Sequence, residues 1–158
     1  MRIKRSAATI AGTSGALFGA QVGLGALPAQ AYDAPYDGTD PGSYVNGVRC
    51  ADTGSVKRSA ALSSPVGQSG AVYLYYSSAC RTTWAKIATS APGCQPGVDY
   101  CGSATVHRNS DGKEMTCHIQ PGQSSCYTKQ VNDANVTSYA NGHYDNGAWT
   151  YYGQTGSY

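Results

Sequence analysis

Six cysteines in a chain with few aliphatic residues most limit how this sequence can fold. They are Cys50, Cys80, Cys94, Cys101, Cys117 and Cys126. An even number of cysteines in a small exported chain is typical of a disulfide framework. Such bonds stabilise domains whose hydrophobic core is too small to do so alone. We therefore expect all six cysteines to be paired, with no free thiol.

The N-terminal residues predict export. Three basic residues precede a mildly apolar stretch at residues 7–27, and "ALPAQA" then places small residues at Ala29 and Ala31. This order is typical of a secretory signal peptide, residues 1–31, cut after Ala31. Five glycines interrupt the apolar stretch, so we do not expect it to anchor the chain in a membrane. The expected location is extracellular.

The expected mature chain is almost neutral and rich in tyrosine. Loss of the leader removes three of the 11 basic residues and none of the 9 acidic ones, which leaves 8 against 9. Because nucleic-acid binding normally requires a basic surface, we expect no such partner. Leu, Ile, Val and Phe number 13 in this part, but it holds all 13 tyrosines and both tryptophans. A near-neutral, aromatic-rich chain favours folding over disorder.

Cysteine spacing favours one pairing of the fifteen that six cysteines allow. "GCQPGVDYC" and "CHIQPGQSSC" each enclose a short Pro/Gly loop, which favours Cys94 with Cys101 and Cys117 with Cys126 and leaves Cys50 for Cys80. In "LYYSSACRTTWAKI", Cys80 is followed by Arg81 and has no adjacent histidine. A nucleophilic thiolate needs a nearby base, so we interpret Cys80 as structural and Arg81 as a turn residue.

Regular turn signals predict an all-β fold. Pro-Gly, Asn-Gly and Asp-Gly pairs separate short β-prone runs, with strands at residues 71–77 and 82–88. Two hairpins are expected, one turning at residues 109–112 and one at the "DNG" of residues 145–147. "GQSG" at residues 67–70 is interpreted as a loop. We predict one small disulfide-stapled antiparallel β domain, residues 44–158, with sandwich or barrel-like architecture.

The segment 32–43, "YDAPYDGTDPGS", has turn chemistry but no apolar run. We expect it to be an extended N-terminal arm. Such an arm could become ordered on a partner protein. Its expected contact residues are Tyr32, Tyr36, Asp37 and Asp40.

Several motifs resemble one family of secreted bacterial proteins. "YDGTDP", "LYYSSACRTTWAKI", "SCYT" and "SYANGHY" together span nearly all of the mature chain. The chain resembles the YjfA-like family, a domain of unknown function. The resemblance implies no catalytic residues. It does imply a role, since small members are similar to adaptor subunits of actinobacterial umbrella toxin particles, which join a lectin-like, trypsin-fold subunit to a toxin-bearing stalk.

The sequence lacks patterns typical of hydrolases or metal sites. There is no G-x-S-x-G motif, and Glu114 is the one glutamate, whereas glycosidases use paired carboxylates. His107, His118 and His143 have no metal-ligand spacing. We therefore predict a non-enzymatic protein without cofactor or metal.

The aromatic residues leave two functions open. A structural adaptor would contact other secreted proteins through Trp84 or Trp149 and the N-terminal arm. A carbohydrate or cell-wall binding module would use Trp149, Tyr151 and Tyr152 on the last hairpin as a stacking platform. Aromatic residues on two separate faces would favour the adaptor, and one flat strip with adjacent Asn or Asp would favour sugar binding. A secreted enzyme or enzyme inhibitor is a weaker alternative.

Overall fold

A computed structural model describes residues 35–90 and 101–158 of the chain. They form one nine-stranded antiparallel sheet, preceded by a two-stranded hairpin of β1 (Tyr44–Val45) and β2 (Val48–Arg49) and by the 3-10 turn η1 (Cys50–Thr53). The strands of the large sheet are β3 (Gly54–Ser64), β4 (Gly67–Ser77), β5 (Thr82–Ala88), β6 (Gly102–Arg108), β7 (Glu114–His118), β8 (Ser125–Tyr127), β9 (Val131–Asn132), β10 (Ser138–Asp145) and β11 (Thr150–Gln154).

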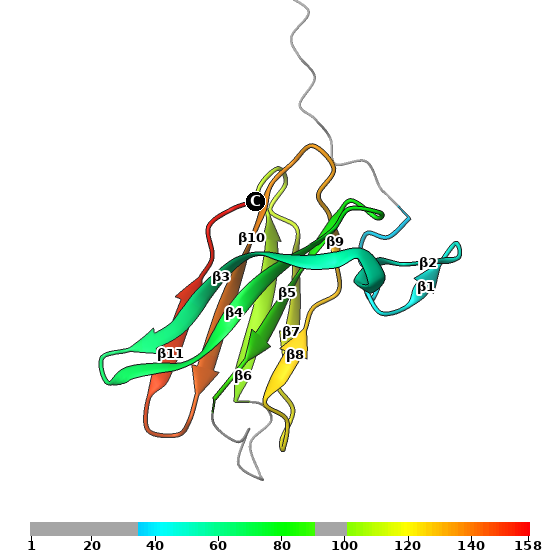
Figure 1. The fold of residues 1–158 in the computed structure, drawn as a ribbon. Coiled ribbons are helices and arrows are strands. Elements are labelled where there is room, and N and C mark those ends of the chain that lie inside the picture. Colours follow the sequence, from blue (N-terminus) through cyan, green and yellow to red (C-terminus); the bar gives the residue numbers. More distant parts are fainter. Residues whose placement is uncertain (1–34, 91–100) are drawn as a thin grey trace, which may run out of the picture.

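The sheet curls into a nearly closed barrel (Figure 1). Its strand order is β7-β6-β10-β11-β3-β4-β5-β8, and β9 pairs with β5. β7 and β8 therefore stand at the two ends of this order. The disulfide between Cys117 on β7 and Cys126 on β8 joins them, with the two Cα atoms 6.0 Å apart. The all-β, barrel-like, disulfide-stapled fold predicted from the sequence is confirmed.

Turn chemistry places most of the predicted strands correctly. β5 has the predicted bounds, and Val106 pairs with Met115 in the β6–β7 hairpin as expected. The β1–β2 turn uses Asn46 and Gly47, both with positive φ, as tight hairpin turns require. The last hairpin, β10–β11, turns at residues 146–149.

The sequence interpretation missed β3 and the start of β4. β3 reads "GSVKRSAALSS", in which Leu62 is the one large apolar residue that is buried, so no alternating apolar pattern marks the strand. The interpretation of "GQSG" as a loop was wrong, because Gly67–Gly70 belong to β4. Gly70 has a φ of 98°, and any Cβ there would collide with the carbonyl of Ala88 on β5. Glycine at this position therefore allows β4 and β5 to approach each other closely.

Small residues and tyrosines make the core. The fully buried aliphatic residues include Leu62, Leu74 and Ile87, and Tyr144 and Tyr151 fill space that larger cores give to Leu or Phe. Two facing glycines bring the layers together: a Cβ at Gly142 or Gly153 would lie within 3.3 Å of Leu62 Cδ2. The core therefore depends on close packing around few side chains.

The described cysteines are all disulfide-bonded. The predicted pairs Cys50–Cys80 and Cys117–Cys126 are both present. Cys101 is also disulfide-bonded, and its predicted partner Cys94 lies outside the described residues. Cys80 is thus unavailable as a nucleophile. Arg81 occupies the β4–β5 turn with a φ of 53° and donates a hydrogen bond to Asn135 Oδ1 (2.9 Å).

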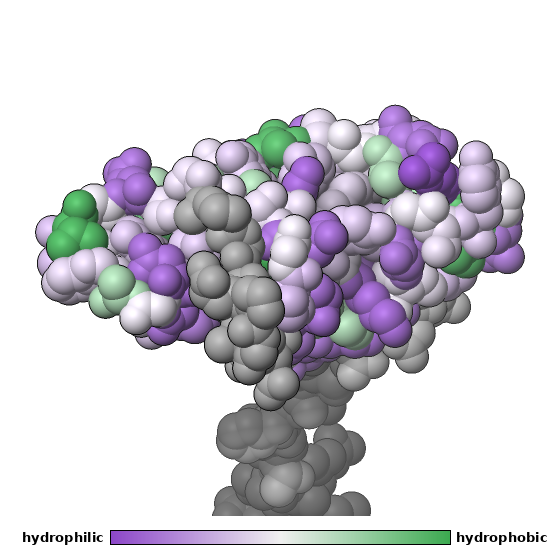
Figure 2. Space-filling model, turned by 90° about the horizontal axis from the view of Figure 1, so that it is seen from below, coloured by the Kyte–Doolittle hydropathy of each residue, from purple (hydrophilic) through white to green (hydrophobic). Residues whose placement is uncertain are grey.

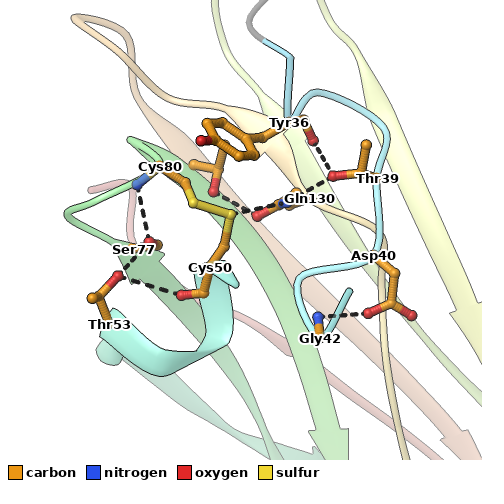
Figure 3. Close-up of a disulfide and its surroundings, with 10 residues drawn as sticks. Tyr36, Thr39, Asp40, Gly42, Cys50, Thr53, Ser77, Cys80 and Gln130 are labelled. Carbon is orange, nitrogen blue, oxygen red and sulfur yellow. Dashed lines mark hydrogen bonds between the residues drawn. A yellow bond between two sulfur atoms is a disulfide. The ribbon is translucent and has the colours of Figure 1, made fainter. Parts of the chain in front are cut away.

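The described part of the predicted arm, residues 35–43, forms successive turns instead of extended backbone. Gln130 fixes it, because its backbone N–H donates to Thr39 O (3.0 Å) and its side-chain amide donates to Thr39 Oγ1 (2.8 Å). Figure 3 shows this contact beside the Cys50–Cys80 disulfide, which ties η1 to the β4–β5 turn. Asp40 Oδ1 accepts a hydrogen bond from Gly42 N–H (2.6 Å), so the Asp and Gly residues build turns here.

Replacing Cys117 and Cys126 together by alanine should loosen the barrel where its two ends meet. A closed loop of this length contributes about 2.5 kcal/mol in the chain-entropy model, so we expect a destabilisation of that order. Hydrogen exchange should accelerate first at the amides of β7 and β8. The matched control is the Cys50→Ala, Cys80→Ala pair, which leaves β7 and β8 joined. Equal acceleration in all strands of the first variant would contradict this account.

Candidate binding surfaces

Exposed apolar side chains are scattered on this barrel. The face in Figure 2 is mostly hydrophilic, with separate hydrophobic groups. Val66, between β3 and β4, is one such exposed residue, at 53%. Isolated groups of this kind are normal on soluble proteins. Aromatic and polar side chains that gather in two hollows of the outer face are therefore better candidates for binding.

The first hollow, here called the polar groove, lies on the outer face of β6, β10 and β11. Its volume is about 530 Å³, and it is lined by Ser103, Thr105, Asn141, Gly142, His143, Tyr152, Gly153 and Gln154. Because successive residues of a strand face opposite sides, the lining consists of the outward residues of three neighbouring strands, with glycine backbone at two positions. The sheet register sets these side chains in two rows across the strands.

Each row of the polar groove crosses all three strands. Asn141 on β10 pairs with Gln154 on β11 and with Thr105 on β6. In the next row, His143 pairs with Tyr152 and with Ser103. The rings of His143 and Tyr152 are 5.0 Å apart at an angle of 42°. The groove therefore combines an aromatic pair with amide and hydroxyl groups.

Polar pairs continue beyond the groove toward β7. Thr105 Oγ1 and Thr116 Oγ1 are 2.8 Å apart, and His107 Nδ1 lies 2.8 Å from Glu114 Oε1. His107 also stacks on Tyr139, with ring centroids 4.7 Å apart. These contacts hold the outer side chains in fixed positions. Across this hairpin, His107 pairs with Glu114 whereas His118 pairs with Ser103.

The structure corrects the predicted stacking platform on the last hairpin. Tyr151 points inward and is 7% exposed, so it belongs to the core. Tyr152 points outward and is 63% exposed, and its ring partner is His143. Trp149, 45% exposed, stands in the turn before β11, where Asn146 Oδ1 accepts a hydrogen bond from its backbone N–H (2.8 Å). The three aromatic residues therefore do not form one platform.

The second hollow, here called the tryptophan pocket, lies on the outer face of β4, β5 and β8. Its volume is about 230 Å³, and it is lined by Pro41, Gly42, Arg49, Ala51, Tyr75, Trp84, Lys86 and Tyr127. Trp84 stacks on Tyr75 at 5.4 Å and 13°. Tyr127, about half exposed, stands at the margin. Two cations, Arg49 and Lys86, distinguish this pocket from the polar groove.

Trp84 is held at the base of the tryptophan pocket and is not freely exposed. It is 5% exposed, and a Cβ at Gly54 would come within 2.5 Å of its Cη2. Gly54 therefore leaves the space that the indole occupies. The turn at Pro41 and Gly42, from the segment predicted to be an arm, forms another wall.

The two hollows lie on opposite sides of the barrel. β10 packs across the core against β4, since a Cβ at Gly142 would meet Val72 Cβ at 2.8 Å. Asn141 and His143 of β10 point away from this contact into the polar groove, and Tyr75 of β4 points away from it into the tryptophan pocket. The core therefore separates two outward-facing surfaces.

The acidic residues predicted to contact partners are used within the fold. Asp37 is 4% exposed and binds Lys113 Nζ (2.7 Å), Arg108 Nη1 (3.3 Å) and the backbone N–H of Asn132 (2.9 Å). Burial by itself would raise the pKa of Asp37, but these hydrogen bonds and the two cations outweigh it and lower the pKa below 3.8. Arg108 also holds Asp111 through two hydrogen bonds, which lower the pKa of Asp111 to about 2.

The described part of the arm also makes hydrogen bonds within its own turns. Asp40 accepts the hydrogen bond of Gly42 N–H, and the carbonyl of Tyr36 accepts one from Thr39 Oγ1 (2.7 Å). Tyr36 is half-buried, and Tyr32 lies outside the described residues. The prediction that Asp37 contacts a partner is therefore corrected, because its charge anchors the segment to β6 and the turn after it.

One carboxyl is buried without a cation in contact. Asp133 is 6% exposed and accepts a hydrogen bond from Ser138 Oγ (2.7 Å). Burial raises its pKa to about 6, and neither this hydrogen bond nor the charge of Arg108 offsets the effect. Asp133 supports the turn between β9 and β10 and lies in neither hollow.

Neither a metal cluster nor a membrane helix occurs in the part of the chain that the structure describes. No group of three or more His, Cys, Asp or Glu residues there could hold a metal ion. No helix there is long and apolar enough to cross a membrane.

Sequence reasoning missed most residues of the two hollows. Ser103 and Gln154 were not singled out, and neither were Tyr75 and Tyr127. The alternation of Tyr139, Asn141 and His143 in "SYANGHYD" was an available signal for an outward face. The partners of Asn141 lie 36 positions upstream, at Thr105, and 13 positions downstream, at Gln154, so they become neighbours through the sheet register alone.

Comparison with known proteins places this chain in a family. Residues 34–141 match the family model described as "Protein of unknown function (DUF2690)". The chain is also 40% identical over 140 residues to "Uncharacterized protein YjfA" of Bacillus subtilis (strain 168), covering 83% of this chain and 85% of that protein. No solved structure matches. The resemblance to YjfA-like proteins is confirmed.

The raised pKa of Asp133 predicts greater stability at mildly acidic pH. Between pH 4 and 6 the folded chain binds a proton at Asp133 that the unfolded chain, with a pKa near 3.8, does not bind. Stability should therefore fall as pH rises through 6, by about 2 to 3 kcal/mol in all. Below pH 4 it should fall again as Asp37 and Asp111 become protonated.

Denaturant unfolding at pH 5 and pH 7.5 measures the part of this loss that lies above pH 5, about 1.4 kcal/mol. The Asp133→Asn variant keeps an acceptor for Ser138 but cannot ionise, so its stability should be nearly equal at the two pH values. Asp52→Asn, at an exposed position, is the matched control and should keep the wild-type profile. An unchanged pH profile in Asp133→Asn would show that another group is responsible.

Proposed function

The chain belongs to the DUF2690 family of proteins of unknown function, and we propose that it is a non-enzymatic secreted adaptor that holds two partners on opposite faces of its barrel. The observation that carries this proposal is the separation of the tryptophan pocket from the polar groove by the core. A module with one ligand needs one such surface, whereas an adaptor needs two that do not obstruct each other.

The tryptophan pocket has the composition of a protein-binding surface. Tyr, Trp and Arg are enriched at the centres of protein interfaces, and here Tyr75, Trp84 and Tyr127 stand beside Arg49 and Lys86. The stacking of Trp84 on Tyr75 and its contact with Gly54 fix the rings before a partner arrives. Fixed aromatic side chains lose little entropy on binding. We propose that a segment of another secreted protein docks here.

The proposed setting is an extracellular antibacterial toxin particle. The similarity of small YjfA-like proteins to adaptor subunits supports it, with a lectin-like subunit and a toxin-bearing stalk as the two partners. The leader predicted from the sequence at residues 1–31 and the disulfides support secretion. The N-terminal segment contributes Pro41 and Gly42 to the pocket wall, so it takes part in binding as part of the folded surface.

Single substitutions on the two faces should remove different partners. Tyr127→Ala removes half-exposed aromatic area from the tryptophan pocket, and Tyr152→Ala does the same in the polar groove. In pull-downs from culture supernatant of the producing organism, analysed by mass spectrometry, each variant should lose one co-purifying component and keep the other. Tyr44→Ala, 70% exposed and outside both hollows, should retain both.

The melting temperatures of the three variants should stay near that of the wild type, because each removes an exposed ring. Loss of both components in either variant, at unchanged melting temperature, would mean one continuous binding surface and would contradict the two-sided adaptor. Retention of every component in Tyr127→Ala and Tyr152→Ala would remove these hollows as partner sites.

The absence of hydrolytic activity is a further prediction. His107 and Glu114 form a hydrogen-bonded pair on an exposed strand face, but no hydrogen bond in the described part of the chain joins His107 to a serine or cysteine. We expect no turnover of peptide, ester or glycan substrates by the purified protein. Turnover that disappears in both His107→Ala and Glu114→Gln would contradict the proposal and assign a catalytic role to this pair.

A further inference from the structure

We propose that the polar groove binds an uncharged oligosaccharide. This inference rests on the proposed function for the presence of a partner at this face, and it names the chemical group through which that partner would be held, a neutral glycan. It departs from the platform expected on the last hairpin, because Tyr151 is buried and Trp149 does not line the groove. Three features carry it: the chemistry of the lining, the hydrogen-bonding capacity left free, and the support of the exposed ring.

The lining suits a neutral ligand with many hydroxyl groups. The side chains of the groove are two hydroxyls, two amides, one imidazole and one phenol, and none of the lining residues is Asp, Glu, Lys or Arg. A phosphate or carboxylate ligand normally recruits Arg or Lys, so an anionic ligand is disfavoured. A volume of about 530 Å³ lies within the range of small-ligand sites.

The two amides are free to bind a ligand. Asn141 and Gln154 face each other across β10 and β11, and neither side chain makes a hydrogen bond within residues 35–90 and 101–158. Each amide offers two donor hydrogens and an acceptor oxygen. Sugar hydroxyls likewise donate and accept, so the pair could bind adjacent hydroxyls of one ring. In contrast, the hydroxyl of Thr105 is already hydrogen-bonded to that of Thr116, so Thr105 would form a fixed edge of the groove.

Tyr152 supplies the apolar contact that a sugar ring needs. One face of a pyranose carries C–H groups that pack on an aromatic ring, while its hydroxyls point outward to polar neighbours. Tyr152 is 63% exposed, and His143 supports its ring at a centroid distance of 5.0 Å. The amides of Asn141 and Gln154 lie at the next outward-facing positions of the same two strands. An aromatic ring beside free amides is therefore the recognition pattern on which the inference depends.

Binding to defined neutral oligosaccharides tests the inference with the purified protein alone. The probes are the tetrasaccharides of N-acetylglucosamine, β-1,4-glucose and α-1,4-glucose, measured by isothermal titration calorimetry, with an array of neutral and acidic glycans alongside. We expect at least one neutral glycan to bind. Tyr152→Ala and Asn141→Ala should each weaken that binding about tenfold or more, at an unchanged melting temperature.

Two further variants separate ring stacking from general damage to the surface. Tyr152→Phe keeps the ring and should retain affinity within about threefold, because the phenol oxygen is not the stacking element. Tyr127→Ala, on the opposite face, should bind the glycan as the wild type does.

The glycan experiment can fail without the adaptor failing. Absence of binding to every neutral glycan at millimolar concentration would overturn the inference, as would binding that survives Tyr152→Ala and Asn141→Ala or that requires acidic sugars. If Tyr152→Ala nevertheless loses one component in the supernatant pull-down, the groove binds protein and the two-sided adaptor stands. If glycan binding is found but no second component is held at the tryptophan pocket, the inference stands and the adaptor does not.

Discussion

The closure of one continuous sheet governs the rest of this structure. Cys117 and Cys126 join the strands at the two ends of the sheet order, so that strands remote in sequence enclose a shared interior. Once the sheet is closed, the alternation of side chains along each strand divides every strand into an inner and an outer set. The core and the two hollows are therefore products of the same geometry.

The shortage of aliphatic residues has consequences on both sides of the sheet. Inside the barrel, the facing glycines Gly142 on β10 and Gly153 on β11 let β3 and β4 pack close to the backbone of these two strands. The rings of Tyr144 and Tyr151 fill other parts of the core. Outside, Tyr152 forms a ring pair with His143 and Tyr75 forms one with Trp84. Tyrosine is suited to both roles because its ring is apolar and its hydroxyl tolerates water. The same residue type thus stabilises the fold and lines both hollows.

Ion pairs anchor the N-terminal segment to the barrel. Asp37 joins Arg108 and Lys113, and thereby ties residues before β1 to the β6–β7 hairpin. This anchoring positions Pro41 and Gly42 as a wall of the tryptophan pocket. The polar groove, by contrast, has no charged side chain in its lining. The two faces therefore differ in chemistry, which suits them to different partners.

The sequence by itself determined the all-β class, two hairpins and two of the disulfides, and it left the choice between a sandwich and a barrel-like sheet to the structure. These follow from local chemistry: turn residues such as Asn46 and Gly47, alternation in β4, and short cysteine spacings. Tertiary structure decided what local patterns do not encode. The polar strand β3 is ordered by its neighbours, Asp37 is an anchor because Arg108 lies opposite it, and Asn141 meets Gln154 and Thr105 through register. Contacts between distant residues depend on closure of the sheet, and no short stretch of sequence predicts that closure.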